Sequence, residues 1–430
     1  MNSTLAEQSV WAVDRIKDHV FKIGSGITPS GGAASYLDAG VPLLRSQNVH
    51  FDGLRLDDVA FIADETHDEM SGTKLRARDV LLNITGASIG RCAFVPDNFG
   101  EGNVNQHVCI IRPTARLDHR FLTYCLSAPW GQDQVFSSFT GASRQGLGQR
   151  DLGAIQVPLP PLPEQQRIAA YLDASCAAID AAVTAKRRQL ETLDALRQST
   201  VFHAVTKGLA PSSPVKASGI AWLGMVPAHW EVRRIKDIAV LRSGDFIPAE
   251  DISPTGDYPV YGGNGLRGYT SSFTHDGRFA LIGRQGALCG NINYAEGKFW
   301  ATEHAVVATL LKQHDRLWFG ELLRAMNLNQ YSNAAAQPGL AVDRIKFLQL
   351  PVPPPTEQAQ ISAYIETTLC ELKQIVGVLE SQIATLNAYR KSLIHECVTG
   401  QRRITEADVR AIHERLDKVA ANPIQKPSHA

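Results

Sequence analysis

The strongest constraint on the fold is a stretch of sequence that occurs twice. Residues 157–208 begin VPLPPLPEQQRIAAYLD, and residues 350–400 begin LPVPPPTEQAQISAYIE. Glu164-Gln165 aligns with Glu357-Gln358 at an offset of 193 residues (357 − 164), and the same offset aligns Arg197 with Arg390. The sequence therefore indicates one structural unit built twice.

Each copy predicts a proline cluster followed by one long helix. Proline lacks the N–H group and restricts the residue before it, so the clusters cannot lie inside a helix. The apolar positions of the second copy then step by alternating four and three residues, which is the heptad of a coiled coil. They are Ile365, Leu369, Leu372, Val376, Leu379, Ile383, Leu386, Leu393 and Cys397. The first copy keeps this register, so each helix is expected to pair with the other. The alternative is two ordinary core helices, although these mostly run about 8 to 20 residues.

A glycine-rich segment with short apolar runs precedes each helix and also recurs. Trp11 aligns with Trp230, and Gly86-Ala87-x-x-Gly90 aligns with Gly286-Ala287-x-x-Gly290, while the offset drifts from 219 (230 − 11) to 200 (286 − 86). Such drift is expected where loops differ in length around a retained framework. Residues 80–84 and 279–282 are predicted to be buried strands that end at a glycine turn.

Composition limits the classes of function. The 430 residues carry 43 Lys+Arg and 43 Asp+Glu, so any nucleic-acid surface must be local rather than global. Seven cysteines without a C-x-x-C pair are typical of reduced thiols rather than of disulfides or a zinc site. No apolar run of signal-peptide length and no uncharged run of membrane-span length is present, which predicts a soluble, cytoplasmic protein without a membrane partner.

No catalytic motif is evident in the sequence. A P-loop, an H-E-x-x-H zinc motif and a G-x-S-x-G nucleophile turn are all missing, as is the N-P-P-[FY] loop expected of an amino-methyltransferase acting on DNA. The glycines at 86 and 90 and at 286 and 290 lack the full dinucleotide-binding spacing. We therefore expect no metal site and no catalytic residues.

The doubled pattern resembles the specificity (S) subunits of type I restriction-modification systems. The residues that carry the resemblance are Pro161-Leu162-Pro163-Glu164-Gln165-Gln166-Arg167-Ile168, the linker at 219–230 and Tyr258-Pro259-Val260-Tyr261-Gly262-Gly263-Asn264-Gly265. The resemblance covers residues 11 to 400. It implies an α+β fold with two α/β target recognition domains, separated by a long antiparallel two-helix coiled coil, in a pseudo-two-fold internal repeat. A bipartite DNA site with local two-fold axes favours the same antiparallel pairing.

On this basis the chain is divided into six segments. They are residues 1–157, target recognition domain 1; 158–207, first spacer helix; 208–229, linker; 230–350, target recognition domain 2; 351–400, second spacer helix; and 401–430, C-terminal helix and tail.

The resemblance also implies the partners and cofactors. Each recognition domain would recognise one half of a bipartite site in double-stranded DNA, and the helices would dock two modification (M) subunits, which restriction (R) subunits join. S-adenosylmethionine, ATP and Mg would belong to those partners and none to this chain. The docking candidates are Glu164, Gln165, Arg167, Glu357 and Gln358. The second copy lacks an arginine equivalent to Arg167, so the second contact would differ in detail.

Polar loop residues are the candidates for DNA contact, because Arg, Asn, Gln, Ser and Thr hydrogen-bond to base edges. In the first domain they are Arg45, Ser46, Gln47, Asn48, Ser143, Arg144 and Gln145; in the second they are Asn264, Arg267, Arg284, Gln285 and Gln337. For each one the alternative is a turn-forming residue with a local hydrogen bond. His107 and His304 recur and are interpreted as framework histidines. Arg197 and Arg390 interrupt both heptads, either as extended surface arginines or as residues that fix register or docking.

Three functions compete at this point. The first is a non-catalytic DNA-specificity subunit. The second is a self-contained DNA methyltransferase or endonuclease, against which the missing catalytic loop argues. The third is a coiled-coil scaffold without nucleic acid, which leaves the two glycine-rich domains unexplained.

Overall fold

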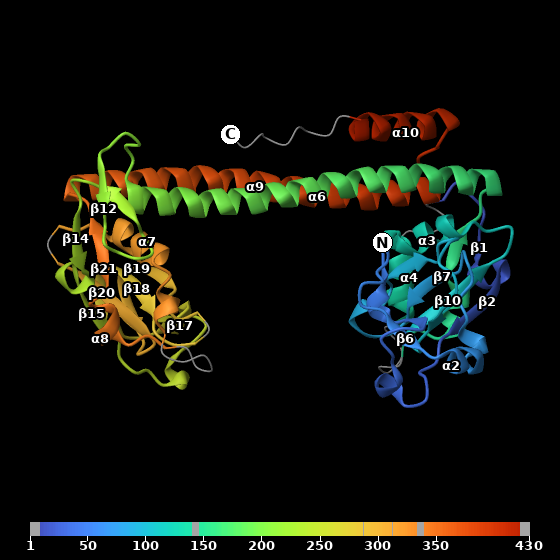
Figure 1. Cartoon of the computed structure of the whole chain (residues 1–430). Helices are drawn as coiled ribbons and strands as arrows, with labels where there is room; N and C mark the ends of the chain where they lie inside the picture. The colour runs from blue at the N-terminus through green and yellow to red at the C-terminus, as the bar shows by residue number, and fades with distance from the viewer. Residues whose placement is uncertain (1–8, 140–145, 287, 312, 333–338, 422–430) are drawn as a thin grey trace. The chain divides into compact units, whose positions relative to one another are not determined.

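The computed structural model of the chain describes residues 9–139, 146–286, 288–311, 313–332 and 339–421. It forms two compact units (Figure 1). Unit 1 comprises residues 1–186 and 381–430, and unit 2 comprises residues 187–380. Each of the long helices is divided between the two units.

The two predicted long helices are continuous. They are α6 (Leu162–Lys207) and α9 (Pro355–Thr399). The prolines at 163 and 355 lie in the first turn, where proline is tolerated because those N–H groups have no helical partner. Gly208 and Gly400 follow the helices with φ of 77° and 79°, a left-handed conformation that commonly ends a helix.

Within each unit the segments of α6 and α9 run antiparallel. In unit 1, Lys186 Nζ donates to Gln382 Oε1 over 2.6 Å, while Asp180, one and a half turns earlier, pairs with Arg390 over 3.3 Å. In unit 2, Val205 and Val201 share a core with Ile361 and Ile365. The predicted fold class, with an antiparallel two-helix coiled coil and an internal repeat, is confirmed.

Unit 1 contains a strand-rich domain built from residues before α6. One sheet has the antiparallel order β2 (Val20–Ser25), β10 (Val108–Pro113), β7 (Val80–Asn83) and β8 (Cys92–Phe94). A second has the order β6 (Ala60–Ile62), β3 (Val41–Leu44) and β9 (Asn103–Val104). Two pairs are added: β4 (Val49–His50) with β5 (Gly53–Leu54), and β1 (Val13–Arg15) with β11 (Gln156–Pro158). The helices are α2 (Asp64–Glu69), α3 (His119–Ser127), α4 (Pro129–Phe139), α5 (Gln149–Ala154) and, after α9, α10 (Glu406–Ala421).

Unit 2 repeats this plan with a larger sheet. Its order is β15 (Ala239–Ser243), β20 (Ala305–Leu310), β18 (His275–Gly283), β19 (Ile292–Ala301), β16 (Tyr258–Gly262) and β17 (Gly265–Thr270). β14 (Glu231–Arg234) pairs with β21 (Gln349–Val352), and β12 (Val215–Ala217) with β13 (Met225–Pro227) in the linker. The helices of the domain are α7 (Arg316–Ala325) and α8 (Val342–Ile345).

The central strand of unit 1 is buried on both faces. Cys109 and Ile111 of β10 pack with Phe121 of α3 and with α6, whereas Val108 and Ile110 pack with a second core on the other side. The period of two between these sets is that of a strand. Both predicted buried strands, in β7 and β18, are present at their glycine turns.

The C-terminal helix α10 lies in unit 1. Thr405 and Asp408 form its capping box, since Asp408 N donates to Thr405 Oγ1 over 3.2 Å and Thr405 N donates to Asp408 Oδ2 over 2.9 Å. Val409 and Ile412 of α10 pack against the core that contains α6.

One helix among the described residues, α6, is long and apolar enough by length and composition to cross a membrane. Half of the qualifying window is buried inside the structure. Ile168, Leu172 and Ile179 belong to the core of unit 1, so this apolar character is used in protein packing.

Candidate nucleic-acid interface

In each unit, four loops that are far apart in the sequence lie together. In unit 1, Gly26 N donates to Val108 O over 3.0 Å, and Asn105 N donates to Leu44 O over 3.1 Å. Ile84 N donates to His107 O over 3.0 Å. These bonds join four loops, residues 26–29, 45–48, 84–90 and 105–107, which we call loop cluster 1.

The same backbone bonds recur in unit 2. Gly244 N donates to Ala305 O over 3.0 Å, Thr302 N to Tyr261 O over 2.9 Å, and Arg284 N to His304 O over 2.8 Å. They join residues 244–247, 262–267, 284–286 with 288–290, and 302–304, which we call loop cluster 2. The two clusters are therefore equivalent in backbone structure.

The first loop of each cluster requires a glycine. A Cβ added to Gly26 would lie 1.9 Å from the Val104 carbonyl oxygen, and one added to Gly244 would lie 2.1 Å from the Ala301 carbonyl oxygen. Main-chain atoms cannot withdraw from such contacts as a flexible side chain can. The Ser-Gly match at these positions thus marks a close backbone approach that fixes the loop in both units.

The third loop is the repeated G-A-x-x-G segment. Gly90 N donates to Asn83 O over 2.9 Å, and Gly290 N to Gly283 O over 2.7 Å. Gly86 and Gly286 have φ of 72° and 88°, which favours glycine. These glycines form a turn that connects β7 to β8 and β18 to β19.

Four candidates of the first domain lie in loop cluster 1. Gln47 is exposed and donates through Nε2 to Asp58 Oδ2 over 2.5 Å. Arg45 donates through Nη2 to Asp58 O over 3.1 Å and lies over the Tyr36 ring, while Ser46 O accepts from Asn83 Nδ2 over 2.7 Å. The Gln47 amide is the group in this loop most open to solvent.

Asn48 is buried and holds the loop. Its Nδ2 donates to Arg55 O over 2.9 Å and to Asp58 O over 3.1 Å, and its Oδ1 accepts from Arg45 N over 2.9 Å. These bonds satisfy both amide protons of Asn48 inside the fold, which favours the turn-forming alternative for this residue.

Four of the five second-domain candidates lie in loop cluster 2. Asn264, Arg267 and Gln285 are exposed. Arg284 is half-buried, and its Nη1 donates to Ser243 Oγ over 3.2 Å. The structure thus brings together two segments that the sequence analysis had treated separately.

Four candidates, Ser143, Arg144, Gln145 and Gln337, lie outside the described residues. The residues that follow them occupy equivalent positions, because Leu147 N donates to Ile84 O over 2.9 Å and Leu340 N donates to Arg284 O over 2.8 Å. These bonds also align Ile84 with Arg284, at the same offset of 200 that aligns Gly86 with Gly286.

The recurrent histidines differ in their contacts. His107 Nδ1 lies 2.6 Å from Thr85 Oγ1, whereas His304 Nε2 lies 3.1 Å from Glu303 Oε1. His107 thus joins the third and fourth loops of its cluster, as a framework histidine would.

Two docking candidates, Gln165 and Gln358, are buried. Gln165 Oε1 accepts from Asp118 N over 2.8 Å, and Gln358 Oε1 accepts from Asp315 N over 2.9 Å. The two aspartates are the N-caps of α3 and α7. Each glutamine also donates to a carbonyl of its own proline cluster, Pro160 O or Pro353 O. These side chains lock the long helix to the domain before it and present no free group to a partner.

The remaining docking candidates are partly exposed. Glu164 pairs with Arg167, whose Nη1 also lies 3.3 Å from Glu406 Oε1. Glu357 instead accepts from Trp230 Nε1 over 3.1 Å and lies 2.7 Å from His229 Nε2. The second copy lacks an equivalent of Arg167, and its glutamate, Glu357, contacts Trp230 and His229 instead.

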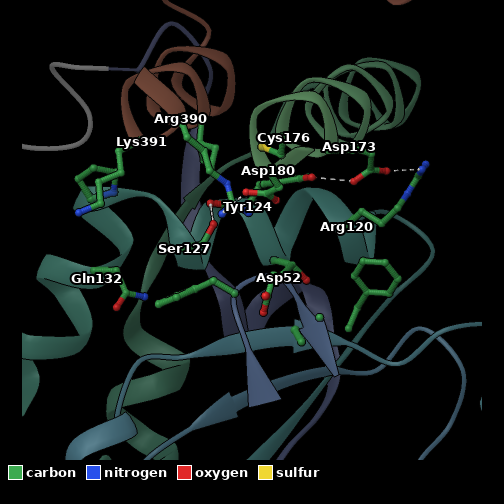
Figure 2. Close-up of a pocket in the computed structure, with 18 of the residues that line it drawn as sticks. Asp52, Arg120, Tyr124, Ser127, Gln132, Asp173, Cys176, Asp180, Arg390 and Lys391 are labelled. Atoms are coloured by element: carbon green, nitrogen blue, oxygen red, sulfur yellow. Dashed lines mark hydrogen bonds and ion pairs between the residues drawn. The ribbon is translucent and has the colours of Figure 1, made fainter. Parts of the chain in front are cut away.

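A cavity of about 900 Å³ lies in unit 1 between the helix pair and helices α3 and α4 (Figure 2). On its wall, Tyr124 Oη donates to Asp173 Oδ1 over 2.7 Å, and Arg120 Nη1 donates to Asp173 Oδ2 over 2.9 Å. Arg390 pairs with Asp180 nearby. Four aspartates line the cavity against two arginines and one lysine, so it does not have the excess positive charge of a phosphate site.

Six of the seven cysteines are buried, and Cys370 is exposed. All seven cysteines are free, and burial raises the pKa of the Cys92 and Cys109 thiols to about 12, which keeps them protonated. No group of three or more His, Cys, Asp or Glu side chains in the described part of the chain is placed to hold a metal ion.

Comparison with known proteins adds a family match. A model for the type I restriction modification DNA specificity domain matches residues 9–192 and 227–375. The specificity subunit of the Escherichia coli type I restriction enzyme EcoprrI is 44% identical over 138 residues, which span 31% of this chain and 34% of that protein. The EcoKI specificity subunit of Escherichia coli strain K12 is 21% identical over 86% of this chain and 84% of its own length. The match thus spans about a third of the first relative and most of the second.

Two solved structures have a similar fold. The HsdS subunit from Thermoanaerobacter tengcongensis aligns with a TM-score of 0.55 at 17% identity, covering 91% of this chain and 97% of that one. A chain from a study of complex assembly and conformational transition in a type I R-M system aligns with a TM-score of 0.69 at 15% identity, covering 90% of this chain and 97% of that one. At these identities the likeness concerns the fold.

Proposed function

Because this chain belongs to the family of type I restriction modification DNA specificity domains, we propose that it is the DNA-specificity subunit of a type I restriction-modification complex. Loop cluster 1 would recognise one half of a bipartite site in double-stranded DNA, and loop cluster 2 would recognise the other half. The observation that carries this proposal is that the clusters share a backbone and differ in side chains.

The difference is found at equivalent positions. Ile84 in cluster 1 is replaced by Arg284 in cluster 2, and Gln106 by Glu303. A catalytic site built twice would need the same reacting groups in both copies. Two surfaces that recognise different base sequences need different hydrogen-bonding groups on the same support, because base edges differ in their donors and acceptors.

The charge of the chain bears on how tightly it would bind. Its formal net charge is zero, so the chain alone has little general attraction for phosphates. We therefore assign the larger part of the affinity to modification subunits that enclose the duplex. Those partners would supply S-adenosylmethionine and the methylation chemistry, and restriction subunits would supply ATP- and Mg-dependent cleavage. This chain would contribute no catalytic residue.

Docking of two modification subunits is assigned to the starts of the long helices. Glu164, Arg167 and Glu357 retain partly exposed side chains there. Because the glutamates have different partners in the two copies, the two docking contacts would not be identical.

The experiment is selection from a random duplex library. The purified chain is mixed with the library, with and without its modification subunit, and the retained DNA is sequenced. We expect a two-part motif with a fixed gap that is enriched strongly only when the modification subunit is present. Methylation of DNA by the chain alone would instead favour a self-contained methyltransferase, and no enrichment in either mixture would favour a scaffold.

A further inference from the structure

Phe246 is the most exposed of three exposed apolar residues in loop cluster 2; the other two are Leu266 and Leu288, each 53% exposed. The side chain of Phe246 is 70% exposed, although it lies between Asp245 and the buried Ile247. Exposing a large aromatic ring forgoes the stabilisation that its burial would give. Exposed apolar residues that gather among polar groups, as these three do, often mark a binding surface.

The loop that carries Phe246 is held firmly. Asp245 N donates to Ala301 O over 2.9 Å, and Asp245 O accepts from Trp300 Nε1 over 3.2 Å. Ile247 anchors the other side because its side chain is buried. The outward position of the Phe246 ring is therefore set by its two neighbours and costs little to organise on binding.

Loop cluster 1 has a counterpart. Between Gly26 and the buried Pro29, the side chain of Ile27 is 50% exposed. The next residue, Thr28, donates through Oγ1 to Gln106 Oε1, which ties this loop to the fourth loop of the cluster. In both units the loop after the Ser-Gly pair thus displays one apolar side chain.

This loop contains no cation in either unit. Residues 26–29 are GITP and residues 244–248 are GDFIP. A loop without lysine or arginine, and in one case with an aspartate, is unsuited to phosphates, because the carboxylate would be repelled. Cationic and amide groups lie in the neighbouring loops, where Arg284 contacts Ser243 and Gln285 is exposed. The first loop of each cluster therefore lies beside the loops that carry polar side chains, and it is itself suited to contact an apolar group of a ligand.

In an intact duplex, the apolar group that a base offers in the major groove is the 5-methyl group of thymine. We propose that Phe246 packs on a thymine methyl group in the half-site recognised by unit 2, and that Ile27 does so in the half-site recognised by unit 1. This inference rests on the proposed function and adds two specificity-determining residues to it.

The test combines protein and DNA substitutions in the complex of the full chain with its modification subunit. Once the wild-type target is known, each thymine of the second half-site is replaced by uracil, which lacks only the methyl group. At one of these positions, replacement by uracil should lower the affinity of the wild-type complex about fourfold, which is the effect of removing one buried methyl group. Phe246→Ala should bind the thymine duplex about tenfold more weakly than wild type and should not distinguish uracil from thymine there. Ile27→Ala should do the same in the first half-site only.

Controls separate this inference from folding and from the proposed function. Phe21→Ala removes a phenylalanine that is 77% exposed on β2, outside both clusters, and should leave affinity unchanged. Thermal unfolding of Phe246→Ala should match that of wild type. A wild-type complex with no two-part target would defeat the proposed function. A wild-type complex with such a target, in which Phe246→Ala binds normally or keeps the full uracil effect, would overturn this inference alone. A third outcome would also overturn this inference: Phe246→Ala binds more weakly, but uracil at no position weakens wild-type binding, and 2-aminopurine fluorescence shows unstacked bases. The ring would then be a wedge between base pairs.

Discussion

Units 1 and 2 use the same backbone framework but different polar side chains on the long helices. In both, a buried glutamine of the Glu-Gln pair holds the N-cap of a domain helix. The preceding glutamate diverges, because Glu164 pairs with Arg167 whereas Glu357 binds Trp230 and His229. The comparison teaches that the glutamine maintains the fold, while the glutamate is free to change its partner.

The helix pairs also differ at one equivalent position. Arg390 pairs with Asp180 in unit 1. Its counterpart Arg197 lines a small hollow in unit 2 together with Lys373, which is equivalent to Asp180, and pairs with Asp194 of its own helix. The arginine therefore has a cross-helix partner in one unit and a local partner in the other.

The largest effect is expected where the two units are most alike. Gly26→Ala and Gly244→Ala would each force a Cβ against a carbonyl oxygen, and each should lower the free energy of unfolding by about 3 kcal/mol. Gly377→Ala is the control, because its Cβ meets nothing within 4 Å and it lies in α9. That control should gain about 0.5–1 kcal/mol from helix propensity. Chemical denaturation of the three variants checks this, and a tolerated alanine at 26 or 244 would break the equivalence.

The glutamine pair should give the next largest effect. Gln165→Leu and Gln358→Leu each leave a buried N–H and a buried carbonyl without partners, which should cost about 2 kcal/mol in either unit. Similar losses in both, measured by denaturant unfolding, would support one shared role. A loss in only one unit would mean that the two locks are not equivalent.

A charge change tests the difference between the helix pairs. Asp180→Asn should destabilise the chain by about 1 kcal/mol, because it removes the partner of a half-buried arginine. Lys373→Asp should stabilise it by about 0.5 kcal/mol by giving Arg197 a partner across the helices. The melting temperatures of both variants should move in opposite directions, and movement in the same direction would refute this account of the coil.

The smallest effect is a pH dependence that comes from one histidine of unit 1, His395. His395 occupies the position of Phe202, and burial lowers its pKa below the ordinary value of 6.5. The unfolded chain therefore takes up the proton first, so stability is lost as pH falls through 6.5 toward the lower folded-state pKa. His395→Phe should remove this part of the acid destabilisation. The unfolding free energies of the two proteins should change in parallel with pH above about pH 7 and diverge below about pH 6. Curves that stay parallel over the whole range would exclude the effect.

The sequence predicted the parts of the fold that local pattern determines. Proline clusters, the heptad and the repeated G-A-x-x-G segment located α6, α9 and the turns after β7 and β18. The burial of Gln165 was not predictable, because its partner Asp118 lies 47 residues away in sequence. A Glu-Gln pair at an exposed helix start has the same residue pattern as one whose glutamine is buried against a neighbouring helix.

Local sequence pattern also located part of the candidate site. Gln47, Asn264 and Gln285 were found because turn-rich polar loops are visible in sequence. Their assembly into two equivalent clusters depends on backbone bonds between loops of unequal length. The match of Ile84 with Arg284 has the offset of 200 that the repeated G-A-x-x-G segment gives, and the backbone bonds agree with it.

The most direct measurement for the central claim is a map of adenine methylation in DNA from cells that express this chain with its modification subunit. Maps are compared for wild type, Gln47→Ala in cluster 1 and Gln285→Ala in cluster 2. We predict a bipartite motif in which each substitution relaxes the sequence of one half and leaves the other half and the gap unchanged. A substitution that alters both halves together, or a motif without two parts, would contradict the assignment of one half-site to each unit.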